Sequence, residues 1–199
     1  MTAPTMSAAT LAFAKRLIAI AIPPLRSRQL SVHHVSSAFN PSWLDALPPP
    51  TTAAPTVTLI NGSDFQRVAA TDPAVGIGRR TRSYENLDRH VSWIGHAAGY
   101  LEQSVGRRVA CAAYASRAGD SSLGRHHDDW DGVIVQLQGE KHWSVWPDPL
   151  AAPDEIVTRA GDVLVLRRGV VHDVSTPKSS CHLAFAIADT HLVGEPNVM

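Results

Sequence analysis

The sequence is poor in features that would place it in a specialised class of protein. Only two cysteines occur in 199 residues, too few for the disulfide framework of a small secreted domain. Cys111 and Cys181 each lie in an apolar stretch, and we interpret both as buried small hydrophobic residues. A disulfide-stapled fold is therefore not predicted.

An excess of charge of either sign is also lacking. Lysine and arginine total 18, as do aspartate and glutamate, so the formal net charge is zero. A broad positive field, which attracts nucleic acid or an anionic membrane, is not available from this composition. We predict no direct binding to nucleic acid or membrane, and we expect a small-molecule, peptide or protein substrate, with a homodimer possible.

Long uninterrupted hydrophobic runs are absent as well. The most apolar segment, 8–22, contains Lys15 and Arg16, follows no basic residue and ends at Pro23-Pro24. This pattern favours an amphipathic helix packed on the domain, or a mobile N-terminal arm, over a signal peptide or membrane anchor. The expected location is cytoplasmic.

The length suits one domain of ordinary size. Prolines are dense from Leu47 to Pro55, where they favour extended structure and exclude helix. We therefore expect an N-terminal helical arm and proline-rich linker over residues 1–55, and the folded domain over 56–199. The first strand of that domain is predicted at Thr56–Ile60, before the turn signal Asn61-Gly62.

One helix is predicted in this domain, followed only by strands. Ser83 would cap the helix and Gly106 would stop it, with apolar residues at helical spacing at Tyr84, Leu87, Val91, Ile94, Ala98, Leu101 and Val105. Short runs between turn residues then predict strands at 109–115, 132–137, 142–146, 163–166, 170–174 and 182–188. Several strands without intervening helices indicate an antiparallel barrel or sandwich.

The segment Arg125–Asp131 concentrates imidazoles and carboxylates. Residues two apart on a strand share a face, so either His126 with Asp128 or His127 with Asp129 would present one nitrogen and one oxygen together. His172, at the end of an apolar strand, is the candidate third ligand. Two imidazoles and one carboxylate are typical of non-haem iron(II) oxygenases. These residues alone do not decide which of the two pairs binds the metal. They also fit a solvated acidic turn that binds no metal.

The sequence that follows resembles the JmjC-type cupin family, in particular its ribosomal-oxygenase branch. The resemblance rests on His126-His127-Asp128, then Gln136-Leu137-Gln138-Gly139-Glu140-Lys141-His142-Trp143, Gly161-Asp162 and Arg168-Gly169-Val170-Val171-His172. It implies a mainly β cupin, or double-stranded β-helix, barrel with flanking N-terminal helices. It also implies an oxygenase that uses iron(II), 2-oxoglutarate and dioxygen, with His126, Asp128 and His172 as the metal ligands.

Two further residues receive roles from the resemblance. Lys141 matches the basic residue that pairs with the distal carboxylate of 2-oxoglutarate, and Tyr114 matches a tyrosine that helps to hold the same co-substrate. A surface lysine on a hairpin and a purely packed tyrosine are the alternatives. No Ser/His/Asp or Cys/His nucleophile is evident, so no catalytic residue is predicted beyond the metal ligands.

The sequence departs from the family pattern at three positions. Ala112 stands where the family often has asparagine, Ala186 where it has serine, and Arg167 where it has proline. The loss of two polar groups around the co-substrate keeps a second function under consideration, a non-catalytic metal-binding cupin that acts as a sensor or binding module. A metal-assisted isomerase or lyase on the same fold is a third.

Overall fold

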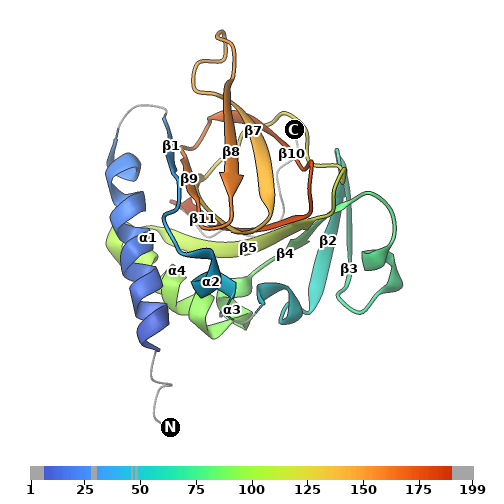
Figure 1. Ribbon diagram of the computed structural model, residues 1–199, viewed down its shortest axis with the longest axis horizontal. Helices are drawn as coiled ribbons and strands as arrows, with labels where there is room; N and C mark the ends of the chain where they lie inside the picture. The colour runs from blue at the N-terminus through green and yellow to red at the C-terminus, as the bar shows by residue number, and fades with distance from the viewer. Residues whose placement is uncertain (1–6, 28–30, 46, 48, 190–199) are drawn as a thin grey trace.

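Two antiparallel sheets face each other and enclose the centre of the protein, as Figure 1 shows. The computed structural model describes residues 7–27, 31–45, 47 and 49–189. Its elements are α1 (Ala8–Arg26), β1 (Val32–Val35), α2 (Pro41–Asp45), η1 (Pro50–Thr52), β2 (Thr56–Asn61), β3 (Asp64–Ala69), η2 (Pro73–Gly76), β4 (Thr81–Tyr84), α3 (Leu87–His90), α4 (Ser92–Val105), β5 (Arg108–Ser116), β6 (Asp131–Gln138), β7 (Glu140–Trp146), β8 (Asp154–Arg159), β9 (Val163–Leu166), β10 (Val171–Ser175) and β11 (Ser180–Ala188).

The larger sheet has the strand order β1-β9-β6-β11-β5-β4-β2-β3, and the smaller sheet has the order β10-β7-β8. Because successive side chains of a strand point to opposite faces, β11 serves two cores. Leu183 and Phe185 join the core beneath the helices, whereas Ala184 joins the core between the two sheets. The predicted antiparallel barrel is thus confirmed, and its interior is the space that a site can use.

The helices cover the outer face of the larger sheet (Figure 1). The helix α1 is long and apolar enough to meet the length and composition of a membrane span. Its apolar residues Phe13, Leu17 and Ile20 are nevertheless buried within the protein, in one core with Ile94 and Leu101 of α4. Of the two alternatives drawn from the sequence, the packed amphipathic helix is the one observed.

Three sequence-based boundaries differ from the structure. The sheet already includes β1, which pairs with β9, so residue 55 does not separate an arm from the barrel. The helix α1 continues through Pro23 and Pro24 to Arg26. The helix expected from Ser83 begins later, because Ser83 pairs with Tyr114 of β5. Sheet pairing overrides the helical spacing there.

Gly139 forms the tight turn between β6 and β7, with a φ of 65°. A Cβ atom at this position would lie 1.9 Å from the carbonyl oxygen of Ser179, so only glycine fits. The turn fixes the start of β7 against the segment that leads into β11. It therefore fixes the depth at which Lys141, two residues later, enters the barrel.

Candidate metal centre and adjoining cavity

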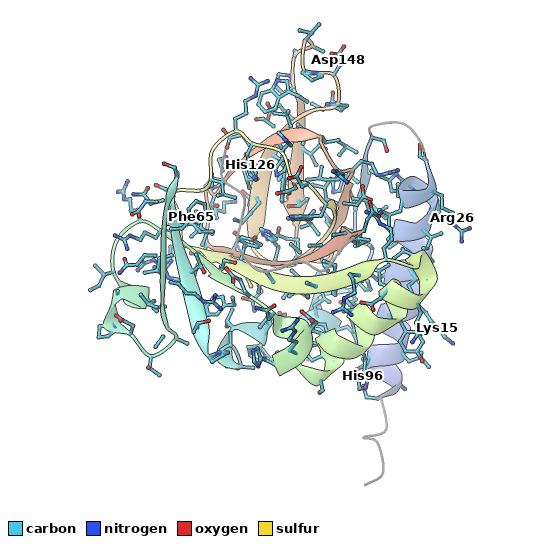
Figure 2. All side chains as sticks on the ribbon, turned by 180° about the vertical axis from the view of Figure 1, so that it is seen from behind. Lys15, Arg26, Phe65, His96, His126 and Asp148 are labelled. Atoms are coloured by element: carbon cyan, nitrogen blue, oxygen red, sulfur yellow. The ribbon has the colours of Figure 1, made fainter. Side chains whose placement is uncertain are left out.

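A pair of backbone hydrogen bonds joins the two histidines of the predicted site. The N–H of His126 donates to the carbonyl of His172 at 2.9 Å, and the N–H of His172 donates to the carbonyl of His126 at 2.8 Å. The N–H of Gly169 also donates to the carbonyl of Asp128 at 3.0 Å. His126 and Asp128 lie in the loop before β6, outside the strand spacing that the sequence argument used, and this bridge gives them their position. Figure 2 labels His126 at the barrel.

The side chains of His126, Asp128 and His172 converge, with one ligand atom from each lying within 4.8 Å of the others. The Nε2 atom of His126 is 3.9 Å from Asp128 Oδ1, and that of His172 is 3.7 Å from Asp128 Oδ2. Their Nδ1 atoms contact the carbonyls of Gly124 and Val170, so both Nε2 atoms face the shared centre. His127 and Asp129 are exposed, so the structure brings together the first of the two registers.

Burial disfavours the charged forms of these three side chains unless a cation binds between them. It lowers the pKa of His172 to about 4, with His126 as the second cause, and it also lowers the pKa of His126. It raises the pKa of Asp128 to about 7. Two neutral imidazoles and one carboxylate suit a divalent metal of the iron type, whose charge would offset the carboxylate. The residues present therefore fit the metal that the sequence predicted.

A cavity of about 600 Å³, including its open mouth, adjoins this centre inside the barrel. Its lining comes from both sheets and from the loop before β6: Ile60, Thr81, Tyr114, Ser122, Leu123, His126, Asp128, Trp130, Ile134, Lys141, Trp143, Leu166, His172, Val174, His182 and Ala184. Most of this surface is apolar, as is usual for a small-molecule site with a few placed polar groups. The metal centre and Lys141 thus line one chamber.

Lys141 is buried in that chamber, with 2% of its surface exposed. Its Nζ donates to Ser116 Oγ at 3.1 Å, and no ion pair with this ammonium occurs among the described residues. Burial lowers the pKa of Lys141 to about 8. An unpaired ammonium inside a barrel is costly, and an anionic ligand would offset that cost. The alternative of a surface lysine is excluded.

Tyr114 lines the same chamber from β5. Burial, and then the nearby Asp128, raise the pKa of its phenol above the ordinary value, so it remains a neutral hydrogen-bond donor. Its ring stacks on the imidazole of His182, with centroids 5.2 Å apart and an interplanar angle of 17°. Sequence analysis assigned no role to His182. Its spacing of two residues from Ala184 along β11 was the signal that it faces the barrel interior.

The wall formed by β5 and β11 carries the two alanine departures. Ala112 pairs with Ala184, and Ala186 pairs with Gly132 of β6. Alternation from Tyr114 places Ala112 on the inner face, and alternation from His182 does the same for Ala186. The wall therefore offers methyl groups where the family pattern has polar side chains.

The third departure, Arg167, has a structural role. Its Nε donates to Asp131 Oδ1 at 2.8 Å, and its Nη1 donates to the carbonyls of Pro24 and Ser27 at the end of α1. Asp131 also accepts hydrogen bonds from Arg107 and from the N–H of Arg168. Although burial raises it, these donors hold the pKa of Asp131 below its ordinary value. We call this group, Arg107, Asp131 and Arg167, the Asp131 clasp.

The fold and the three converging side chains define the class of protein, a cupin-type barrel with a candidate metal centre among its lining residues. Residues 96–192 match the JmjC domain family. Ribosomal oxygenase 2 of Bos taurus is 33% identical over 106 residues, which cover 46% of this chain and 23% of the relative. Ribosomal oxygenase 2 of Mus musculus is 29% identical over 135 residues, covering 59% and 29%. The chain spans about a quarter of the length of these relatives.

Solved structures show the same fold. The ribosomal oxygenase YcfD from Escherichia coli, in complex with cobalt and 2-oxoglutarate, aligns with a TM-score of 0.59 and 15% identity, over 85% of this chain and 52% of that one. The predicted cupin-type, mainly β barrel with N-terminal helices is confirmed. The family match over residues 96–192 and these relatives confirm the predicted resemblance to the JmjC family, in its ribosomal-oxygenase-like branch.

Proposed function

We propose that this protein is an iron(II)- and 2-oxoglutarate-dependent oxygenase, in which His126, Asp128 and His172 hold the metal. The observation that carries the proposal is that these three ligands and Lys141 line the same chamber. The buried ammonium of Lys141 has no ion-pair partner among the described residues. A metal with open positions would sit at one end and a fixed cation at the other. A dicarboxylate keto acid matches both ends, since it has a chelating group and a second anionic group.

The chain's own residues would have distinct tasks in this reaction. Lys141 and Tyr114 bind and orient the distal carboxylate of the co-substrate, and the apolar lining, including Ile134 and Leu166, excludes water. When bound, iron(II) and 2-oxoglutarate supply the activation of dioxygen that hydroxylates a carbon–hydrogen bond. His126 and His172 remain neutral ligands, held by their backbone bridge, and no side-chain nucleophile is required.

We propose a protein side chain as the substrate, with a free amino acid, a peptide or a related metabolite as alternatives. Relatives support this choice by their names: ribosomal oxygenases, and a bifunctional lysine-specific demethylase and histidyl-hydroxylase, NO66, of Caenorhabditis briggsae that is 26% identical over 100 residues. Consumption of 2-oxoglutarate with peptides of ribosomal proteins, against free amino acids, tests it. Stimulation by the free amino acids alone would contradict it.

The oxygenase itself is tested by adding iron(II) and then 2-oxoglutarate to the metal-free protein without oxygen. We expect the visible charge-transfer band of a chelated keto acid, and no band in His126→Ala. His127→Ala is the matched control, because this neighbour is exposed and should keep the band. Stoichiometric metal binding without a band in the wild type would contradict the oxygenase.

A second function, a non-catalytic metal-binding cupin, is favoured by one observation. The inner wall carries alanine at 112 and 186, and these positions have polar residues in the family pattern. Under this alternative the metal would bind as tightly as in an oxygenase, but 2-oxoglutarate would not add to it. The same titration separates the two functions.

A further inference from the structure

His182 occupies a wall of the chamber beside the two residues assigned to the co-substrate. It lies on β11 directly opposite Tyr114 of β5, and its ring also contacts Trp143 of β7, with centroids 5.7 Å apart. Only 5% of its surface is exposed. The imidazole is therefore clamped between aromatic rings, with its orientation fixed before any ligand arrives.

The Nδ1 atom of this ring is buried and has no hydrogen-bond partner in the part of the chain that the structure describes. A buried polar atom left unpaired is destabilising, so a ligand that pairs with it would bind more tightly. The hydroxyl of Ser180, two residues before His182 on β11, shares this condition. Ser180 pairs with Ser116, which accepts the hydrogen bond from Lys141. Two unsatisfied polar atoms of β11 thus lie on the strand beside the partner of Lys141.

Charge and burial keep the ring neutral. Burial, and then the ammonium of Lys141, lower the pKa of His182 well below its ordinary value. A neutral imidazole carries one N–H donor, and the tautomer that places it on Nδ1 suits an anion bound near Lys141. The charge of Lys141 that disfavours the imidazolium also attracts such an anion.

The alanines of the wall offer no donor that would compete with His182. A carboxylate accepts about four hydrogen bonds, of which Lys141 and Tyr114 supply two. On the inner face of β5 and β11 the neighbouring positions, Ala112, Ala184 and Ala186, have no donor. We infer that His182 donates from Nδ1 to the distal carboxylate of 2-oxoglutarate, as a third binding residue beside Lys141 and Tyr114. This inference rests on the proposed function.

The test compares two keto acids on the anaerobic iron(II) protein, with affinity read from the charge-transfer band. 2-Oxoglutarate has a distal carboxylate, whereas pyruvate has the chelating group alone. His182→Phe keeps an aromatic ring and removes the N–H. We expect this variant to bind 2-oxoglutarate about 10- to 100-fold more weakly, the size of a lost hydrogen bond to a charged group, and to bind pyruvate as the wild type does. His182→Gln, which keeps an N–H, should recover part of the loss.

The matched control is His142→Phe, because His142 is on the outer face of β7 with 44% of its side chain exposed. It should leave both affinities unchanged. Equal losses for both keto acids in His182→Phe would assign His182 a purely structural role and overturn the inference. An unchanged affinity for 2-oxoglutarate would overturn it too. If the wild type shows no band, the proposed function itself fails.

A measurement on the unmodified protein covers the case in which His182→Phe does not fold. Nitrogen-15 histidine labelling, with zinc in place of iron, reports the Nδ1–H of His182 by nuclear magnetic resonance. We expect 2-oxoglutarate to bring this proton into a slowly exchanging, strongly hydrogen-bonded state, and pyruvate to leave it unchanged. The same response to both ligands would contradict the inference.

Discussion

The two ends of the chamber are built in different ways. At the metal end, backbone hydrogen bonds between His126 and His172 set the spacing of the ligands, and Asp131 of the Asp131 clasp accepts a hydrogen bond from Arg168, in the segment that leads into β10 and His172. At the other end, one buried ammonium, Lys141, has only a hydrogen bond to Ser116, and the Nδ1 atom of the nearby His182 has no partner among the described residues. The ligands at the metal end are positioned by hydrogen bonds within the protein, whereas the lysine end has polar atoms without such partners. Four experiments test this contrast.

The largest effect is expected from His172→Ala. It removes a buried ligand and leaves two groups, which hold a metal poorly, so affinity should fall by more than the roughly 10- to 100-fold lost when an outer hydrogen-bond partner is removed. Cobalt(II) titration by visible absorption measures this. His127→Ala should bind as the wild type does, and a similar loss there would contradict the chosen register.

Lys141→Met should abolish 2-oxoglutarate binding and yet stabilise the ligand-free protein. Because burial lowers the pKa of Lys141 from 10.5 to about 8, the ammonium opposes folding by up to about 3 kcal/mol at neutral pH. For a depressed pKa, the stability contribution is present above the unfolded value and lost as pH falls through the folded one. The advantage of the variant should therefore be complete below pH 8 and vanish above about pH 10.5.

Urea unfolding of the ligand-free protein between pH 7 and pH 10.5 measures that advantage. Lys178→Met is the control, because Lys178 is exposed and pairs with Glu140 on the surface. A variant of Lys141 that is less stable than the wild type throughout this range would show that its ammonium is already compensated within the protein. The contrast between the two ends would then be lost.

The Asp131 clasp should give an intermediate effect. Arg167→Met removes a cation from buried Asp131 and two donors from the end of α1, so unfolding free energy should fall by about 1–3 kcal/mol. Metal affinity should fall by about tenfold at most, because Arg168 N–H still holds the carboxylate. Arg168→Met is the control, since its exposed side chain does not contact Asp131. Equal effects of both substitutions would contradict the clasp.

The smallest effect is expected from Ala112→Asn, which restores the family residue to the inner wall. A new donor near the co-substrate should tighten 2-oxoglutarate by about threefold to tenfold, the value of a modest net hydrogen bond. Metal affinity should not change, because the ligands do not contact this wall in the described structure. Weaker 2-oxoglutarate binding would show that the alanine side of the wall is needed for its shape.

Much of the barrel was predictable because its inner strands are apolar and β-branched, as in β9, where the observed Val163–Leu166 coincides with the prediction. The strand β8 was missed because its Asp154 and Glu155 are exposed and polar. The strand β1 was missed because His33 and His34 interrupt it, although its pairing with β9 holds it in the sheet. The periodicity of apolar residues predicts buried strands well, but it predicts strands paired at the edge of a sheet poorly.

The candidate site was also predictable only in part. Local sequence marked His126 and Asp128, but their contact with His172, 46 positions away from the first, depends on a backbone bridge that no local pattern encodes. Only the family resemblance selected the register. His182 was missed because its significance comes from an unpaired atom, and pairing is a property of three-dimensional packing.

The reciprocal hydrogen bonds between His126 and His172 have a consequence for how this protein tolerates change. These bonds use main-chain groups, so side chains elsewhere in the chamber are free to vary without moving the two imidazoles apart. The wall of β5 and β11, with Ala112 and Ala186, is therefore a place where this protein tolerates replacement without losing the spacing of its metal ligands.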